Sequence, residues 1–456
     1  MQQFELTREF LDQLEELIQN GDSATAARMI EDLHPADVAD ILEELDASEA
    51  QFIFLLMDNE RAGDVLAELE EDERDRFIRS FPPDVIARRF VDHMESDDAA
   101  DLVGSMSNEQ QQEVLSHLED IEQAGDIVDL LHYDEDTAGG LMAKELVMVN
   151  ENWTILTCLR ELSRQAEQID EIFYIYVVDD DGVFKGRLSL KKMILSPTST
   201  KISQIYLPEV ASVTTDEPAE SVARIMEKYD LVAIPVVDSI GRLVGRITID
   251  DVVDVIREEE EKDYQMMSGI TQDVESSDTV WTQTKARLPW LVIGLFGGML
   301  AAYMISFYEA EIMLFPATAM FIPVITAMGG NVGIQSSAIV VKGLASNSLG
   351  VQNILRNILK ETSGALLNAT FCSSLIFGLT LLFNTGSLAM PVTVTISLFT
   401  VILFASLFGT AFPLLLNRMK IDPALATGPF ITLTNDILGL NIYLFIGKII
   451  LSRFVA

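Results

Sequence analysis

The chain has 456 residues and a formal net charge of −40, from 71 acidic and 31 basic side chains. This length implies more than one domain, and so large an acidic excess disfavours nucleic acid and anionic lipid as partners while it attracts cations. From Trp281 onward there are nine basic and five acidic residues, which leaves 22 basic and 66 acidic residues before it. Two regions of different solvation therefore meet near residue 280. A solubilising surface explains the acidity of the first region as well as cation sensing does.

The rare residues exclude several classes of protein. Cys158 lies in the acidic region and Cys372 in an apolar run, so neither a disulfide framework nor a cysteine zinc site is expected. All four histidines (34, 93, 117 and 132) lie in the first part of the acidic region, and no Ser-His-Asp, Cys-His or HExxH arrangement occurs. We therefore do not expect an enzyme. The segment Met1–Gln13 lacks a signal-peptide pattern, so the acidic region is expected to remain cytoplasmic.

Residues 1–135 are predicted to form an acidic helical domain. Short amphipathic segments such as ADVADILEEL (36–45) follow one another, and weakly similar units recur. Examples of the recurring unit are Ala39-Asp40-Ile41-Leu42, Gly63-Asp64-Val65-Leu66 and Ala100-Asp101-Leu102-Val103. A superhelix of stacked helix pairs fits this pattern.

Residues 136–253 are predicted to form two α/β units, at about 136–198 and 199–253. Strand-like runs around a turn occupy positions 172–194, and the segment 231–253 repeats them at a constant offset. In the repeat, Val177 matches Val236, Gly182 matches Gly241, and Gly186 matches Gly245. The repeat resembles a tandem pair of CBS domains.

The resemblance to CBS pairs implies a candidate nucleotide site. Such pairs often bind adenine nucleotides such as ATP through a Ser or Thr that is followed three residues later by Asp. Thr248 and Asp251 satisfy this pattern, whereas Ser189 is followed by Lys192. At most one site is therefore expected, and an N-terminal helix cap explains Thr248 and Asp251 equally well.

Residues 254–280 are predicted to form an acidic connecting helix that leads to the membrane. Acidic side chains crowd its first half, including Asp254, Glu259 and Asp263. A solvated helix face is the usual explanation of such a run. Its position between a sensor-like region and a membrane region favours a regulatory role.

Residues 281–456 are predicted to form an all-α domain of five helices in contact with membrane lipid. No charged residue lies between Arg287 and Glu309, between Glu311 and Lys342, or between Glu361 and Arg418. One span needs roughly 20 residues, so the last of these stretches must fold back, with 384–387 as the expected turn. The fifth span lies within 423–447. Basic side chains flank one side of these spans, so the segment 1–280 is expected in the cytoplasm and the C-terminus outside, with Lys448 and Arg453 as exceptions.

Two motifs suggest an ion pathway. Asp436 lies in the fifth span, where an isolated carboxylate costs on the order of 3 kcal/mol, and we expect it to face a cation rather than to be a buried structural residue. The second span contains Gly329, Gly330 and Gly333, which weaken a helix and expose carbonyl oxygens, while Asn331 adds a neutral oxygen ligand. Close packing of helices through small residues is the alternative. Oxygen ligands suit a hard cation such as Mg²⁺.

The whole chain resembles the MgtE magnesium channels. The segments GGNVGIQSS (329–337) and DPALATGPFITLTNDILGL (422–440) look like the signatures of that family. The resemblance implies a homodimeric channel that imports Mg²⁺ and that cytoplasmic Mg²⁺ closes. It places the pore and selectivity residues at Asp436, Asn331, Gly329, Gly330, Gly333 and Asn435. It places the Mg²⁺-sensing carboxylates at Asp64, Asp97, Asp101, Asp230, Asp251, Asp254, Glu259 and Asp263. Arg257 and Lys262 interrupt the acidic run, which leaves the number of sensing sites open.

Two other functions are consistent with the sequence. The first is a carrier or exchanger for Mg²⁺ or another divalent cation such as Co²⁺. The second is a CBS-regulated membrane sensor without transport, against which the mid-membrane carboxylate of Asp436 argues.

Overall fold

The structure is a computed structural model of one chain. It describes residues 4–69, 71–165, 172–208, 210–271, 274, 279–345, 354–383, 388–426 and 428–455. The predicted turn at 384–387 lies outside these residues. The chain divides into two compact units, Met1–Arg257 and Glu258–Ala456, and the helix α14 (Ile249–Met267) runs across the division.

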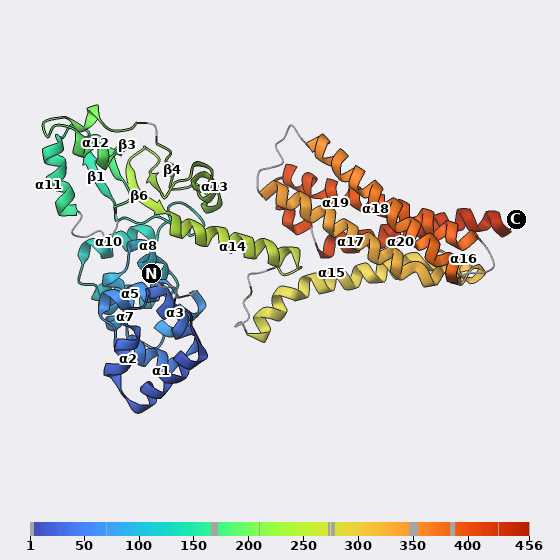
Figure 1. Ribbon diagram of the computed structural model, residues 1–456, viewed down its shortest axis with the longest axis horizontal. Helices are drawn as coiled ribbons and strands as arrows, with labels where there is room; N and C mark the ends of the chain where they lie inside the picture. The colour runs from blue at the N-terminus through green and yellow to red at the C-terminus, as the bar shows by residue number, and fades with distance from the viewer. Residues whose placement is uncertain are drawn as a thin grey trace. The chain divides into compact units, whose positions relative to one another are not determined.

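The first part of the first unit is a chain of short helices (Figure 1). They are α1 (Arg8–Asn20), α2 (Ser23–Ile30), α3 (Pro35–Glu44), α4 (Ala47–Phe54), α5 (Asn59–Ala67), α6 (Glu71–Ile78), α7 (Pro83–Arg89), η1 (Val91–His93), α8 (Ser96–Gly104), α9 (Asn108–His117) and α10 (Ile121–Leu130). Their apolar faces share one core with part of the α/β region that follows. The helical domain expected from the sequence is confirmed.

Many acidic residues of the helical domain begin its helices. Asp22, Asp46, Asp58 and Asp120 each accept a hydrogen bond from a backbone N–H in the first turn of the helix that follows. A carboxylate at this position satisfies an otherwise unpaired donor and complements the helix dipole. Part of the acidity therefore has a structural origin.

Side chains from later helices close the ends of earlier ones. Arg61 donates to the backbone oxygens of Ile30, the last residue of α2, and of Leu33. Arg89 donates to those of Phe54, the last residue of α4, and of Met57. The last turn of a helix leaves its carbonyl groups without a partner four residues on, and the two guanidinium groups add to the turn hydrogen bonds that Ile30 and Phe54 accept from Leu33 and Met57. The same arrangement at two successive steps of the chain supports the predicted superhelix of repeated units.

Two small sheets follow, each with the same topology. The first contains β1 (Val147–Asn150), β2 (Ile175–Val178) and β3 (Phe184–Leu188), and the second contains β4 (Val213–Thr214), β5 (Ala233–Val237) and β6 (Leu243–Thr248). In both, the first pair of strands is parallel and the second is antiparallel. The helices of this region are α11 (Ile155–Gln165), α12 (Leu190–Leu195), η2 (Ile202–Gln204) and α13 (Ala219–Tyr229).

The strand registers confirm the internal repeat. Val177 pairs with Gly186 in the first sheet, and Val236 pairs with Gly245 in the second. Each sheet has a register shift directly after that valine. The turns also correspond, since Gly182 and Gly241 have φ angles of 80° and 85°, a conformation that glycine adopts without strain. The α/β region is therefore a tandem pair of one unit, as the sequence predicted.

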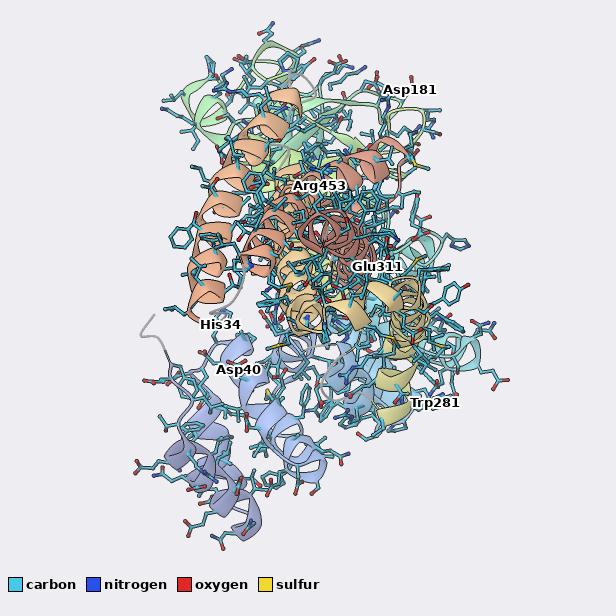
Figure 2. The ribbon with its side chains drawn as sticks, turned by 90° about the vertical axis from the view of Figure 1, so that its right-hand side faces the viewer. His34, Asp40, Asp181, Trp281, Glu311 and Arg453 are labelled. Atoms are coloured by element: carbon cyan, nitrogen blue, oxygen red, sulfur yellow. The ribbon has the colours of Figure 1, made fainter. Side chains whose placement is uncertain are left out.

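The second unit is a bundle of long apolar helices, seen nearly end-on in Figure 2. They are α15 (Val280–Ser306), α17 (Ala317–Ala345), α18 (Ile354–Phe383), α19 (Ala389–Arg418) and α20 (Pro429–Val455), with the short helices α16 (Glu309–Leu314) and η4 (Pro423–Ala426) between them. Five of the described helices are long and apolar enough to cross a membrane. Large apolar side chains such as Phe296, Met320 and Phe371 are exposed on them, as expected of a surface in contact with lipid.

The helix α19 is the centre of this bundle. It packs against α17, α18 and α20. Its buried side includes small residues such as Ala405, Ser406 and Gly409. Small residues let membrane helices approach closely, where the hydrophobic effect between helices is weak. This packing holds α17 and α20 side by side, which positions the candidate pore residues.

Candidate ion pathway and regulatory carboxylates

The carboxylate of Asp436 faces Gly330. Asp436 lies about two turns into α20, nearer the start of the helix than the sequence suggested. A Cβ atom built on Gly330 of α17 would lie 3.8 Å from Asp436 Oδ1 and 3.4 Å from Thr432 Cγ2. The absence of a side chain at Gly330 therefore leaves space beside the carboxylate.

Asp436 has no basic partner among the residues that the structure describes. Lys448, the basic residue of α20 that forms an ion pair there, contacts Glu311 instead. The Asp436 side chain is only partly buried within the single chain. A carboxylate at membrane depth that has no cation from the protein is a candidate ligand for a passing ion.

The glycines of α17 do not break the helix. The helix is continuous from Ala317 to Ala345, so the expected irregular backbone with exposed carbonyl oxygens is wrong. The alternative, close packing, applies to two of the three glycines. A Cβ atom on Gly329 would lie 3.1 Å from Val401 Cγ1 of α19, and one on Gly333 would lie 1.9 Å from Asn435 Nδ2. The three glycines therefore have two roles: Gly329 and Gly333 allow close helix packing, and only Gly330 faces the carboxylate.

The amide side chains of the motif point in different directions. Asn331 is exposed on α17, next to Gly330. Asn435 is 1% exposed and packs inside the bundle rather than beside the carboxylate of Asp436. Among the predicted pore residues, the structure thus brings Gly330 and Asp436 together and separates Asn435 from them.

A second group of carboxylates lies between α8 of the helical domain and the start of α14. Asp97 is 8% exposed, and its neighbours in space include Asp98 and Asp251. Burial, followed by the charges of Asp251 and Asp101, raises the pKa of Asp98 to about 7. Burial and the charge of Asp250 raise the pKa of Asp251 to about 7. Repulsion among the ionised carboxylates therefore destabilises the contact between α8 and the start of α14, and a bound cation would relieve that repulsion.

Polar contacts beside these carboxylates hold the helical domain to the α/β region. Arg246 of β6 is 4% exposed, and its Nη2 lies 3.0 Å from Glu95 Oε1. Ser96 donates its backbone N–H and its hydroxyl to Glu145, at 3.1 and 2.8 Å. Asp98, Glu95 and Arg246 were not predicted from the sequence, because nothing in the local pattern indicates which side chains meet across this contact.

The other predicted sensing residues are more scattered. Glu68 faces Asp64, Asp250 and Asp254, and burial raises its pKa. Asp230 is exposed at the end of α13 with a φ of 50°. Glu259 forms an ion pair of 3.1 Å with Lys262, the basic residue that interrupts the acidic run. Within the described residues, no group of three or more His, Cys, Asp or Glu side chains converges as a metal site does.

The contact between Thr248 and Asp251 is a helix cap. Asp251 Oδ2 accepts hydrogen bonds from the backbone N–H and the hydroxyl of Thr248, at 3.0 and 2.8 Å. Thr248 is 5% exposed. These hydrogen bonds at the start of α14 agree with the capping alternative, and the same aspartate faces Asp97 and Asp98 of the helical domain.

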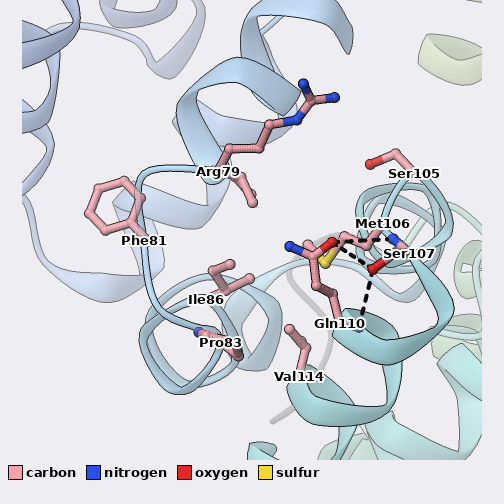
Figure 3. Close-up of a pocket in the computed structure, with 10 residues that line it drawn as sticks. Arg79, Phe81, Pro83, Ile86, Ser105, Met106, Ser107, Gln110 and Val114 are labelled. Atoms are coloured by element: carbon pink, nitrogen blue, oxygen red, sulfur yellow. Dashed lines mark hydrogen bonds between the residues drawn. The ribbon is translucent and has the colours of Figure 1, made fainter.

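A pocket of about 310 Å³ in the helical domain is unrelated to these sites (Figure 3). Apolar side chains such as Ile78, Phe81 and Ile86 line it. Its polar residues Ser107 and Gln110 bind each other at the start of α9. None of the described residues that line the pocket is a carboxylate, so we do not consider it among the candidate cation sites.

Comparison with known proteins agrees with this division of the chain. The MgtE divalent cation transporter model matches residues 322–446, the MgtE intracellular N domain model matches 33–136, and the CBS domain model matches 138–196 and 202–258. The "Magnesium transporter MgtE" of Thermus thermophilus is 34% identical over 96% of this chain and 98% of its own length. That of Bacillus subtilis is 31% identical over 94% of both chains.

A solved structure matches the first unit. It is a crystal structure of the cytosolic domain of the Mg²⁺ channel MgtE in complex with ATP, with 36% identity and a TM-score of 0.50. The match covers 54% of this chain and 99% of that one. Together, the helical domain, the CBS pair and the five apolar helices define a multi-pass membrane protein with a large CBS-containing region. The chain belongs to the MgtE family.

Proposed function

We propose that this protein is a Mg²⁺-selective channel that imports Mg²⁺ and that cytoplasmic Mg²⁺ closes. The observation that carries the proposal is the carboxylate of Asp436, which faces Gly330 and has no basic partner among the described residues. A fixed negative charge beside an open space attracts a cation, and Mg²⁺ prefers oxygen ligands while it gives up its water reluctantly. The names of the MgtE relatives support Mg²⁺ as that cation.

A homodimer would complete the pore. One carboxylate is little charge for a divalent ion, and a two-fold axis beside Asp436 would supply a second one. The exposed position of Asn331 on α17 supports such an arrangement, since its amide oxygen would then line the path between the two chains. In this arrangement Asp436 attracts the hydrated ion and Asn331 contributes a neutral ligand to its water shell.

The first unit would act as the cytoplasmic sensor. The carboxylates of Asp97 and Asp98 face that of Asp251, and Asp101 lies beside Asp98; their repulsion weakens the contact between the helical domain and the CBS pair. Bound Mg²⁺ would neutralise them and favour the docked form, by preferential binding to it. Asp64, Asp254 and Glu68 would respond in the same way. Asp230 is exposed, whereas Glu259 and Asp263 are half-buried, and these three residues would join such sites only through a further contact.

The end of α14 provides a route from sensor to pore within the second unit. A Cβ atom on Gly428, just before α20, would lie 2.1 Å from the backbone oxygen of Met267, the last residue of α14. A Cβ atom on Gly269 would lie 2.5 Å from Pro429 Cγ. Backbones this close move together, so a displacement of α14 would reach the helix that carries Asp436.

ATP is the proposed ligand of the CBS pair. The support is the ATP complex of the related cytosolic domain. In this chain the hydroxyl of Thr248 already binds Asp251, so a ribose at this position would compete with the cap. ATP and Mg²⁺ sensing would thereby share Asp251.

A flux assay tests the proposed function. The purified protein in liposomes that contain a Mg²⁺-sensitive dye should admit Mg²⁺ without a sodium gradient and more slowly admit Co²⁺. Dependence on a sodium gradient would instead indicate an exchanger, and absence of flux with a folded protein would indicate a sensor that does not transport. Single-channel currents that fall as Mg²⁺ is added to the cytoplasmic face test the gating.

A further inference from the structure

Three membrane helices meet at Gly333. A Cβ atom on Gly409 of α19 would lie 2.4 Å from the backbone oxygen of Gly333, so α19 touches the backbone of α17 on one side. On another side, a Cβ atom on Gly333 would lie 1.9 Å from Asn435 Nδ2 and 2.7 Å from Ile431 Cγ2 of α20. The side chain of Asn435 therefore occupies the notch that glycine leaves in α17.

The Asn435 amide is buried in this notch without a hydrogen-bond partner. Both Oδ1 and Nδ2 are inaccessible, and neither forms a hydrogen bond with any residue that the structure describes. A buried amide without a hydrogen-bond partner destabilises the fold, and such exceptions in a native structure need an explanation. The next residue in the chain is Asp436.

We infer that Asn435 is a positioning residue for the ion pathway. Successive residues of a helix point about 100° apart, so a side chain fixed in the notch at Gly333 also fixes the rotation of α20 about its axis. That rotation directs Asp436 toward Gly330, which lies one helical turn from Gly333 on α17. The branched shape of the Asn435 side chain thereby fixes the position of the Asp436 carboxylate. That position in turn determines which cation the carboxylate binds. This inference rests on the proposed transport function.

Four variants test the positioning role. Asn435→Ala empties the notch, and Gly333→Ala places a methyl group in it against the amide. The double variant Gly333→Ala/Asn435→Ala puts the methyl group where the amide was. Asn435→Leu keeps the branching at Cγ and removes the unsatisfied polar atoms. Gly378→Ala in α18 is the matched control, since a Cβ atom there meets nothing within 4 Å.

The readouts are the half-saturating Mg²⁺ concentration and the ratio of Mg²⁺ to Ca²⁺ flux in liposomes, with thermal unfolding measured in parallel. We expect Asn435→Ala and Gly333→Ala each to raise the half-saturating concentration on the order of tenfold, which is about 1.4 kcal/mol of ion binding. Both should also lower the flux ratio. The double variant and Asn435→Leu should return both values toward those of the wild type, and Asn435→Leu should unfold at a higher temperature.

Several results would overturn the inference. Folded Asn435→Ala protein with an unchanged half-saturating concentration and flux ratio would show that the notch does not position the carboxylate. Failure of both the double variant and Asn435→Leu to restore them would show that shape is not the property that matters. Each of these results requires that the wild-type protein transports Mg²⁺. Absence of wild-type flux would instead refute the proposed function, so failure of the inference and failure of the proposed function give different results.

Discussion

Lys448 of α20 and Glu311 of α16 form an ion pair, with 2.5 Å between Nζ and Oε1. Lys448 is one of the two basic residues that contradict the orientation predicted from loop charges. Its charge is balanced by a carboxylate from the short helix that joins the first two spans, at the end of the bundle where Glu311 and Arg453 are labelled in Figure 2. A neutralised lysine adds little to the positive-inside bias, so the exception does not weaken the predicted orientation.

The ion pair leads to a prediction about membrane orientation. In a background in which Cys158 and Cys372 are serine, Glu309→Cys and Arg453→Cys should react with a membrane-impermeant maleimide added outside intact cells. Ser199→Cys, at an exposed position in the CBS pair, should react only after the membrane is permeabilised. Labelling of Ser199→Cys in intact cells would place the first unit outside and contradict the proposed orientation.

The second prediction concerns the pore carboxylate. Asp436→Asn keeps the shape of the side chain and removes the charge, so we expect Mg²⁺ flux into liposomes to fall on the order of a hundredfold, because a divalent cation loses its fixed counter-charge. Thermal unfolding should be little changed, since no described residue pairs with this carboxylate. Glu361→Gln, which removes a carboxylate from α18 of the same unit, should conduct normally. Normal Mg²⁺ flux through Asp436→Asn would refute the electrostatic argument.

Some parts of this structure follow from sequence and others do not. The CBS repeat was predictable because Val177 and Gly186 match Val236 and Gly245 by type and spacing, and the strand registers reproduce those matches. The roles of the three glycines in α17 were not predictable, since Gly329 and Gly333 pack against helices that are distant in sequence while Gly330 faces Asp436. The contact between Glu95 and Arg246 joins residues far apart in the chain, and no local pattern indicates it.

The third prediction is that docking of the helical domain depends on pH when Mg²⁺ is absent. Asp98 and Asp251 have an ordinary pKa of 3.8, and the docked structure raises the pKa of each to about 7. The docked form therefore binds more protons than the separated form, so its stability is greatest at acid pH and falls as pH rises from about 4 to about 7. Protease protection of residues 1–257 should accordingly be stronger at pH 6 than at pH 8.

The Asp98→Asn/Asp251→Asn variant is the control for this pH dependence. Without these two groups the difference between the two pH values should shrink but not vanish, because burial also raises the pKa of Asp97, which the variant keeps. Saturating Mg²⁺ should remove the difference in the wild type, since bound cations neutralise the same carboxylates. Stronger protection at pH 8 than at pH 6 in the wild type would show that the sign of the effect is wrong.

The fourth prediction concerns the contact between α14 and α20. Gly428→Ala would place a methyl group against the backbone oxygen of Met267, at a residue with a φ of 59°. We expect the variant to conduct Mg²⁺ but to close less completely when cytoplasmic Mg²⁺ is raised, because the two helix ends are forced apart. Gly21→Ala is the matched control, since its φ is 69° and nothing lies within 4 Å of a Cβ atom there. Normal closure of Gly428→Ala currents would exclude this contact as the route to the pore.

The last prediction concerns the sensor. Asp98→Asn and Asp251→Asn each remove a ligand for Mg²⁺ and also relieve repulsion, so the two effects oppose each other. If loss of ligands dominates, the variants stay open at Mg²⁺ concentrations that close the wild type; if relief of repulsion dominates, they close at lower concentrations. We expect the first result, a rise on the order of tenfold in the closing concentration, because an amide replaces a charged oxygen ligand and holds a divalent cation more weakly.

Patch-clamp open probability against cytoplasmic Mg²⁺ distinguishes these results when protease protection of the first unit is recorded in parallel. Asp136→Asn, in the segment between the helical domain and the CBS pair, is the control, since the described contacts do not place its carboxylate among those of Asp98 and Asp251. If both sensor variants close at the same Mg²⁺ concentration as the wild type, this group of carboxylates does not take part in gating. Mg²⁺-dependent protection without any change in current would separate docking of the helical domain from closure, and the coupling through α14 would then be refuted even though the first unit binds the ion.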